Sequence, residues 1–256
     1  MVLSISRIKL FKACRRAYEL KYIEGLRPVQ TAEALETGLG FHDMMEQLNK
    51  NGCLPDVEDY SKERAMATAY EKYVYPKFHV ASAEKWEEYA LTRQDKLIGR
   101  VDGIADDGRL VEYKTTSQDI TDEYEYNLQW DEQLLAYMLM TGAREMYYVV
   151  VRKPSIRQKK NESEKEFFDR MVAWYDEDTE SKIRLMIVSR TDEEVNEFFS
   201  DTEKIVREMN AAECYGHYYR NTAYCKCFGR RCEYSSVCLH YDPEQEYVEF
   251  MREEQG

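Results

Sequence analysis

Apolar residues in the first third of the chain recur every three to four positions, the spacing that places them on one face of a helix. This spacing aligns Leu35, Leu39, Met45 and Leu48 for burial in one such stretch. Another stretch ends at Pro76, and proline cannot continue a helix because it lacks the backbone N–H. The pattern predicts three helices, over residues 4–22, 33–49 and 61–75.

The pattern then changes to an alternation of apolar and polar residues, which is typical of half-buried strands. Three alternating stretches follow one another closely, and Asp107-Gly108 marks a turn between the last two. Close spacing along the chain favours antiparallel pairing of neighbours. The predicted strands are "WEEYALT" (86–92), "KLIGRVDGIA" (96–105) and "RLVEYKTT" (109–116).

Helical and strand patterns alternate in the second half of the chain. The run "EMYYVVVRK" is continuously apolar in its middle, which favours a central strand. Thr191 and Glu194 have the spacing of a capping box at the start of a long helix. The expected order is a helix over 127–141, a strand over 145–153, an acidic helix over 161–176 and a strand over 182–191. Together the elements predict an α/β fold, with a mixed sheet flanked by helices.

Composition narrows the class of protein. The chain has 256 residues and 43% hydrophobic content, enough for one large core. A formal net charge of −13 argues against a protein that coats duplex DNA, because such binding depends on many Lys and Arg contacts with phosphate. Two basic runs remain, one within residues 7–21 and "RKPSIRQKK" at 152–160, which contains no acid. Each run is either a local nucleic-acid contact or an ordinary solvated face.

The sequence also bears on the cellular compartment. No stretch reaches the roughly 18 consecutive apolar residues of a membrane span, and the first residues lack the apolar core of a secretory signal. We therefore expect no membrane association and a cytoplasmic location. In a reducing compartment the seven cysteines are expected to be metal ligands, core residues or reactive thiols rather than disulfides.

Three charged residues on the predicted hairpin are candidates for chemistry. Alternation along the strand directs Glu112 and Lys114 to the same face, and Asp102 lies on the neighbouring strand. Two carboxylates can share a divalent cation, while a lysine beside them can hold a water molecule and balance charge. The alternative is an ordinary salt-bridge ladder on the surface of a hairpin.

A shared cation fixes the geometry of the turn. A two-residue turn at Asp107-Gly108 would direct Asp102 and Glu112 to opposite faces of the sheet. A three-residue turn over 106–108, with a left-handed Gly108, instead pairs Asp102 with Glu112. The candidate metal site therefore predicts the three-residue turn.

These residues resemble the motifs of the PD-(D/E)XK nuclease superfamily, in particular its RecB-like branch of CRISPR-associated exonucleases, AddB nuclease domains and phage exonucleases. "GRVDGI" resembles the segment that carries the metal-binding aspartate, here Asp102, and "EYK" resembles the (D/E)XK element at Glu112 and Lys114. Val101 departs from the proline of the family name, as in many RecB-like members. The resemblance implies Mg²⁺ or Mn²⁺ as the metal, with Lys114 positioning the attacking water.

Two further motifs of this branch are matched. "GLGFH" resembles its G-x3-H pattern through Gly38 and His42, which implies that His42 is a third metal ligand. Gln133 and Tyr137 match the Q-x3-Y motif, which implies contact with the substrate strand near the scissile phosphate. The alternatives are a histidine satisfied within the core and a buried tyrosine with a hydrogen-bonding neighbour.

Cysteines at both ends of the chain resemble those of iron–sulfur nucleases in the same branch. The match is carried by "SRIKLFKACRRAYELKY" near the N-terminus and "RNTAYCKCFGRRCEYSSVC" near the C-terminus. It implies a [4Fe-4S] cluster, with Cys227 as a substitute for Cys225. Zinc is the competing interpretation, although only Cys227 and Cys232 have the usual spacing of a zinc pair. The implied cluster ligands are Cys14, Cys225, Cys232 and Cys238.

The resemblance covers about residues 4–239 and implies a DNA exonuclease acting on single strands or ends. A phage single-strand annealing protein is the expected partner, with a CRISPR adaptation complex as the alternative pathway. A non-catalytic DNA-binding or assembly module is the alternative from another class. We expect one nuclease domain over 1–256, with a core at about 30–200 and an iron–sulfur clasp formed by residues 4–22 and 214–240.

Overall fold

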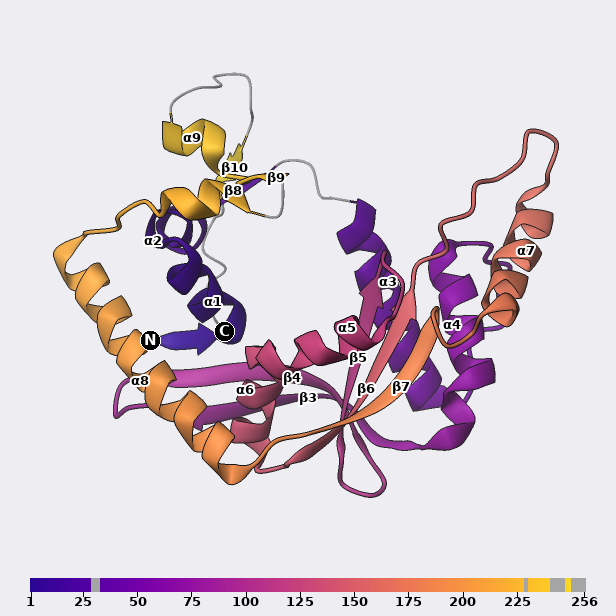
Figure 1. Ribbon diagram of the computed structural model, residues 1–256, viewed down its shortest axis with the longest axis horizontal. Coiled ribbons are helices and arrows are strands. Elements are labelled where there is room, and N and C mark those ends of the chain that lie inside the picture. The colour runs from indigo at the N-terminus through magenta and orange to yellow at the C-terminus, as the bar shows by residue number, and fades with distance from the viewer. Residues whose placement is uncertain (29–32, 228–229, 240–246, 250–256) are drawn as a thin grey trace. The chain divides into compact units, whose positions relative to one another are not determined.

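The computed structural model describes residues 1–28, 33–227, 230–239 and 247–249. The chain forms two compact units (Figure 1). Unit 1 comprises residues 1–31, 88–98 and 196–256, and unit 2 comprises residues 32–87 and 99–195. The expected single domain over 1–256 stays a prediction, and His240 at the end of the expected clasp lies outside the described residues.

A six-stranded mixed sheet is the framework of the fold. Its order is β1-β4-β5-β6-β7, with β3 also paired to β4 (Figure 1). Strand β5 runs antiparallel to β4 and parallel to β6, and β6 runs antiparallel to β7. Helices between the strands make this the α/β fold that the sequence predicts. The strands are β1 (Val2–Ser4), β3 (Val80–Ala90), β4 (Lys96–Ala105), β5 (Leu110–Thr116), β6 (Glu145–Arg152) and β7 (Ile183–Ser189).

Helices cover both faces of the sheet in unit 2. One apolar cluster joins α3, α4 and α7 to β5, β6 and β7, and the other joins α6 to the opposite face of the same strands. Because successive residues of a strand point to opposite faces, Val149 packs in the first cluster and Val150 in the second. The helices are α3 (Glu33–Asn51), α4 (Lys62–Tyr73), α5 (Asp122–Asn127), α6 (Glu132–Thr141) and α7 (Glu164–Glu177).

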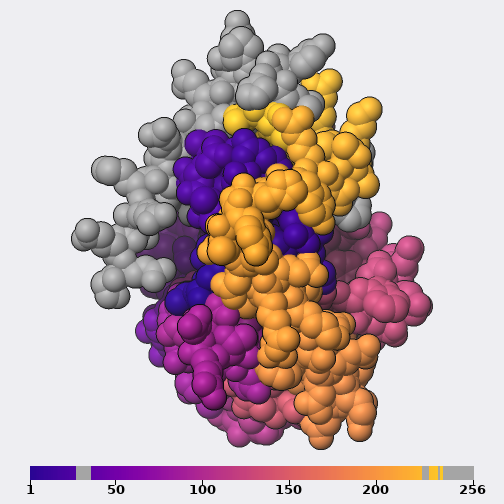
Figure 2. Space-filling model, turned by 90° about the vertical axis from the view of Figure 1, so that its left-hand side faces the viewer, coloured from indigo at the N-terminus to yellow at the C-terminus, as the bar shows by residue number. Residues whose placement is uncertain are grey.

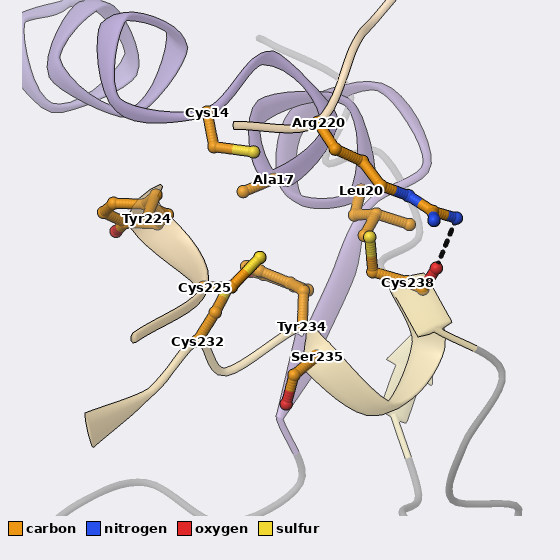
Figure 3. Close-up of a pocket in the computed structure, with 10 residues that line it drawn as sticks. All are labelled: Cys14, Ala17, Leu20, Arg220, Tyr224, Cys225, Cys232, Tyr234, Ser235 and Cys238. Carbon is orange, nitrogen blue, oxygen red and sulfur yellow. Dashed lines mark hydrogen bonds between the residues drawn. The ribbon is translucent and has the colours of Figure 1, made fainter. Parts of the chain in front are cut away.

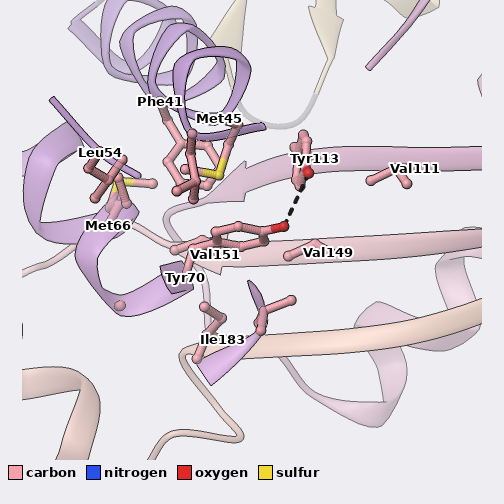
Figure 4. Packing of buried hydrophobic residues seen from close by; sticks show 14 of the residues in the cluster. Phe41, Met45, Leu54, Met66, Tyr70, Val111, Tyr113, Val149, Val151 and Ile183 are labelled. Carbon is pink, nitrogen blue, oxygen red and sulfur yellow. Dashed lines mark hydrogen bonds between the residues drawn. The ribbon is translucent and has the colours of Figure 1, made fainter. Parts of the chain in front are cut away.

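Buried hydroxyl groups in the first cluster are paired with one another (Figure 4). The Tyr70 and Tyr113 hydroxyls are 3.1 Å apart, and Asn49 donates to the Tyr113 hydroxyl over 3.1 Å. The rings of Tyr70 and Tyr113 meet edge to face at 5.5 Å. This pairing matters because an unpaired hydroxyl would cost free energy in so apolar a setting.

Unit 1 brings the two ends of the chain together. Figure 2 shows the indigo N-terminal segment against the orange and yellow C-terminal segment. The Asn221 amide donates to the Ala13 carbonyl over 2.8 Å, and the Arg16 backbone N–H donates to the Tyr219 carbonyl over 3.2 Å. The elements here are α1 (Ile5–Ala13), α2 (Arg15–Tyr18), a π-helical turn (Glu19–Ile23), β2 (Leu26–Pro28), α8 (Asp192–Tyr215), β8 (Lys226–Cys227), β9 (Arg230–Arg231), α9 (Ser235–Leu239) and β10 (Tyr247–Glu249).

The structure corrects several helix boundaries and one burial prediction. The expected helix over 4–22 is interrupted at Cys14, whose extended backbone ends α1 and begins α2. The expected helix over 127–141 is interrupted at Asp131, whose carboxylate caps α6. Met45 and Leu48 are buried as predicted, but Leu39 is 58% exposed because it lies on the other side of α3. The side chain of Leu35 falls outside the described part of the chain. Among the described residues, no helix is both long and apolar enough to cross a membrane.

The three-residue turn predicted between β4 and β5 is confirmed. Gly103 pairs with Val111 and Ile104 with Leu110, and Gly108 has a left-handed φ of 85°. The Ala105 N–H donates to the Arg109 carbonyl over 2.8 Å, which closes the loop. The capping box at the start of α8 is confirmed as well, because Thr191 and Glu194 exchange hydrogen bonds.

The two leucines of α3 make a matched stability test. Leu48→Ala should lower the free energy of unfolding by about 2–5 kcal/mol, because it leaves a cavity in the packed core. Leu39→Ala removes the same atoms from an exposed position and should change stability by no more than about 0.5 kcal/mol. Denaturant unfolding of both variants measures the difference, and equal effects would contradict the packing described.

Candidate metal and thiol sites

Glu112 and Lys114 lie side by side on β5, on the face that α6 covers. Alternation along the strand directs them away from Val111 and Tyr113, which pack in the cluster on the other face. The Glu112 carboxylate is 1% exposed, and its Oε1 pairs with the Lys114 ammonium. Its second oxygen, Oε2, is buried without a hydrogen-bond partner. A buried carboxylate oxygen that has no hydrogen-bond partner within the protein is available to bind another group.

Asp102 approaches this pair from β4, one residue beyond the last regular pair of the hairpin. Its Oδ2 accepts a hydrogen bond from the Tyr113 backbone N–H over 2.8 Å, which fixes the direction of the carboxylate. Its Oδ1 lies 3.4 Å from Nδ1 of His42, on α3. The fold therefore brings Asp102, Glu112 and His42 to one place, although they come from three separate elements.

The electrostatics of the site follow from burial of like charges. Burial and the neighbouring Asp102 carboxylate together raise the pKa of Glu112 to about 7, against the opposing effect of Lys114. Burial alone would lower the pKa of Lys114, but the Glu112 carboxylate raises it above its ordinary value. Burial likewise lowers the pKa of His42, yet its hydrogen bond with Asp102 raises it overall. The carboxylates thus favour the protonated, positively charged forms of Lys114 and His42 beside them.

A chain of hydrogen bonds from α6 holds the lysine. The Lys114 ammonium donates to Oε1 of Gln133 over 2.9 Å, and the Gln133 amide donates to the Tyr137 hydroxyl over 2.8 Å. Tyr137 in turn donates to the Arg100 carbonyl over 2.9 Å. A side chain at Gly99 would collide with the Tyr137 ring at 2.9 Å, so this glycine permits the close approach of α6 to β4.

Tyr137 is 6% exposed, which fits the alternative of a buried tyrosine with a hydrogen-bonding neighbour. Direct contact of Gln133 and Tyr137 with a substrate strand stays a prediction. What the structure adds is their connection to Lys114, which the four-residue spacing alone could not reveal.

Sequence reasoning missed a second set of charges beside Asp102. Glu84 on β3 has a left-handed φ of 46° and pairs with Arg100 over 2.9 Å. Burial raises the pKa of Glu84, and the nearby Glu46 and Asp102 carboxylates raise it further despite Arg100. Glu46 lies one turn after His42 on α3, a spacing that could have suggested a shared face. Glu84 left no such signal, because its place depends on the pairing of β3 with β4.

Four cysteines line one small pocket in unit 1 (Figure 3). The pocket has a volume of about 20 Å³, and its other walls are largely apolar. Burial raises the pKa of the Cys232 thiol, and the neighbouring Cys14 and Cys225 thiols raise it further. The four residues are those that the sequence resemblance selects: Cys14, Cys225, Cys232 and Cys238.

Asn221 and Arg220 organise this pocket, and sequence reasoning gave them no role. The Asn221 backbone N–H points at the Cys14 sulfur over 3.4 Å, and the Asn221 carbonyl lies 3.8 Å from the Cys225 sulfur. Arg220 donates to the Cys238 carbonyl over 2.6 Å. The sequence did contain a signal for both residues, because they are the "RN" that begins the C-terminal cysteine segment "RNTAYCKCFGRRCEYSSVC".

The remaining cysteines differ in their setting. Cys53 and Cys214 are exposed free thiols. Cys227 lies in β8, and its side chain falls outside the described part of the chain. Within the described residues, no group of three or more His, Cys, Asp or Glu side chains has a preformed metal-binding arrangement.

Known proteins provide a comparison of the whole chain. A search of curated proteins finds no match. Among solved structures, the chain resembles a Eubacterium rectale protein assigned as an exonuclease, at 14% identity over 96% of this chain and 90% of that one, with a TM-score of 0.54. An alkaline exonuclease from Laribacter hongkongensis is 13% identical over 83% of this chain and 90% of that one, with a TM-score of 0.46.

The family comparison covers nearly the whole chain. The model of the PD-(D/E)XK nuclease superfamily matches residues 2–239, a range that contains the carboxylate, lysine and cysteine residues described above. The first of the two solved structures supports a shared fold at low sequence identity. Because the family model spans far more than half of its 256 residues, the chain belongs to the PD-(D/E)XK nuclease superfamily.

Proposed function

We propose that this protein is a metal-dependent DNA exonuclease that hydrolyses phosphodiester bonds at DNA ends. The observation that carries the proposal is the buried, unpartnered Oε2 of Glu112 beside Asp102 and Lys114. A surface salt-bridge ladder would leave its charges in water, whereas Glu112 is 1% exposed. The name of the solved Eubacterium rectale structure, an exonuclease, supports action at chain ends.

Asp102, Glu112 and His42 would hold a divalent cation. The donor set fits Mg²⁺ or Mn²⁺, because carboxylate oxygens suit both ions and the imidazole favours the softer Mn²⁺. When bound, the cation would supply positive charge to the phosphodiester and to the attacking water. Its charge would also offset the burial and the repulsion from Asp102 that raise the pKa of Glu112.

Lys114 would hold the attacking water and balance negative charge as it develops. Its ammonium is fixed on one side by Glu112 and on the other by Gln133. Gln133 is itself held by Tyr137, so α6 sets the place of the ammonium with two successive hydrogen bonds. In this proposal Gln133 and Tyr137 are positioning residues, and substrate contact is their second role.

The pocket lined by Cys14, Cys225, Cys232 and Cys238 would hold a [4Fe-4S] cluster. Four thiols from both ends of the chain converge on one largely apolar pocket, and thiolate-only ligation suits such a cluster. Zinc stays the competing metal. A bound cluster would tie the N-terminal helices to the C-terminal segment by covalent ligation.

The proposed setting is phage recombination, with a single-strand annealing protein as partner. An exonuclease that resects one strand produces the single strand that an annealing protein binds. CRISPR adaptation is the alternative pathway.

End-labelled DNA tests the proposed activity. Linear single- and double-stranded DNA with Mn²⁺ or Mg²⁺ should release label from the ends, while circular DNA of the same sequence should persist because it has no ends. Equal cleavage of circular DNA would show that the protein is an endonuclease rather than an exonuclease. DNA binding without hydrolysis under any metal would favour the non-catalytic module.

Neutralising the charged residues should abolish hydrolysis without unfolding the protein. Asp102→Asn and Lys114→Met should each reduce the rate by at least about a hundredfold, because each removes charge stabilisation from the reaction. Lys72→Met removes a lysine that is 52% exposed and pairs with Asp176, so it should leave the rate unchanged. The rates come from the end-label assay and the fold from circular dichroism; full activity of Lys114→Met would refute the site.

The thiol pocket predicts a coloured protein. Anaerobically purified protein should show broad visible absorption, and Cys14→Ser should lose both the absorption and thermal stability, because cluster binding is coupled to folding. Cys53→Ser and Cys214→Ser change exposed thiols and should keep both. Iron and zinc analysis decides the metal, since a colourless protein with stoichiometric zinc would exclude the iron–sulfur cluster.

A further inference from the structure

A second pocket in unit 2 lies where α4 and α7 begin. It has a volume of about 330 Å³, within the range of small-ligand sites. Neither the metal site nor the thiol site uses it, and part of it comes from residues 161–180, which none of the motifs described above includes. Its lining residues are Tyr60, Ser61, Gln158, Glu164 and Phe167.

Two aromatic rings provide the apolar walls. Tyr60 and Phe167 are both half-buried, so each presents part of its ring to the pocket. The Tyr60 ring packs against the Phe168 ring, with centroids 5.8 Å apart, and the Arg170 guanidinium lies 5.3 Å from the centroid of the Phe167 ring. Such rings are the usual platforms for stacking of nucleic-acid bases.

Polar groups form the rim of the pocket. The Gln158 amide donates one hydrogen bond to the Glu162 carbonyl over 2.9 Å, which fixes the side chain and leaves its oxygen free to accept from another group. The Glu164 carboxylate would repel a phosphate but can accept hydrogen bonds from the amino group of a base. The rim therefore suits the edge of a base better than a phosphate group.

The basic run 152–160 passes this pocket in a fixed conformation. Glu162 accepts a hydrogen bond from the Lys159 backbone N–H over 2.8 Å and pairs with Arg170 over 2.7 Å. Arg170 lowers the pKa of Glu162 to about 2, so this acid is already neutralised by its partner. The side chains of Arg157, Lys159 and Lys160 are exposed. A strand with its base in the pocket would thus find positive charge beside its phosphates.

The run begins at the same end of the sheet as the proposed active site. Lys114 of β5 pairs with Val150 of β6, and the Lys153 N–H donates to the Thr116 carbonyl over 2.7 Å. Gln158 lies eight positions after Val150, a stretch that at full extension spans at most about 29 Å. At about 3.4 Å per stacked nucleotide, the pocket lies within roughly eight nucleotides of Lys114.

We propose that the pocket between Tyr60 and Phe167 binds one unpaired base of a single DNA strand whose nearby end is hydrolysed at the carboxylate site. The base must be unpaired, because neighbouring bases cover both faces of a base within a duplex. The basic run holds the adjacent phosphates. This inference rests on the proposed function for its choice of ligand, and it assigns part of residues 161–180 to holding the strand.

Binding to a protein that cannot cut isolates this step. In a Lys114→Met background, fluorescence anisotropy with a labelled single-stranded oligonucleotide gives the Kd. Tyr60→Ala and Phe167→Ala should each weaken binding about tenfold, the usual effect of losing one stacking ring. Tyr60→Phe should restore it, and Trp86→Ala, which removes a ring that is 66% exposed on β3, should change Kd less than twofold.

Abasic substitution tests the ligand itself. Removing the base at one position, within about eight nucleotides of the end, should weaken binding to the background protein. The Tyr60→Ala variant should bind the abasic and the intact oligonucleotide equally well, because the missing base and the missing ring remove the same contact. Lys159→Gln and Lys160→Gln should reduce the salt dependence of binding, whereas Lys85→Gln on β3 should not.

The outcomes separate this proposal from the proposed function. The base pocket would be overturned if the Tyr60→Ala and Phe167→Ala variants had the same Kd as Trp86→Ala. It would also be overturned if no abasic position changed the Kd, even if DNA ends are hydrolysed. Stronger binding of RNA with the same dependence on Tyr60 would overturn the assignment to DNA. Base-dependent binding without hydrolysis by the unaltered protein would support the pocket and refute the exonuclease.

Discussion

The arrangement of unit 2 depends on one interaction, the burial of Glu112 between Asp102 and Lys114. A buried carboxylate without a positive partner would cost several kcal/mol, and a second carboxylate beside it adds to that cost. Lys114 offsets part of this cost at Oε1, while Oε2 keeps no partner. Such an arrangement contributes little to stability, so its presence in a packed fold is best explained by the binding of a cation.

Neighbouring features follow from the need to hold these charges in place. The three-residue turn sets the register of β4 against β5, and the Tyr113 N–H then directs the Asp102 carboxylate. The interruption before α6 at Asp131 starts a new helix, from which Gln133 reaches Lys114. The absence of a side chain at Gly99 lets that helix approach β4. The turn, the helix interruption and the glycine, each a local feature of the sequence, therefore together determine the surroundings of the Lys114 ammonium.

Local patterns in the sequence predicted strands β4 to β7, the hairpin turn and the capping box of α8, because alternation, glycine conformation and side-chain caps act over a few residues. They failed where contacts between distant segments determine the conformation or the burial of a residue. Cys14 breaks a continuous helical pattern, and the Asn221 group that meets its sulfur lies 207 residues further along the chain. Leu39 has the spacing of a core residue but faces away from it. The Glu84 pair with Arg100 depends on β3 lying beside β4, which hydropathy does not encode.

Net charge and local charge have separate consequences here. A chain of net charge −13 repels a DNA strand at long range, so contact depends on segments where acids are absent or already paired. The run 152–160 meets this condition through its composition, and Glu162 meets it through its pairing with Arg170. This long-range repulsion also limits binding far from the site. The strand would then be held by a few short-range contacts, stacking among them, which favours recognition of an end over coating of a duplex.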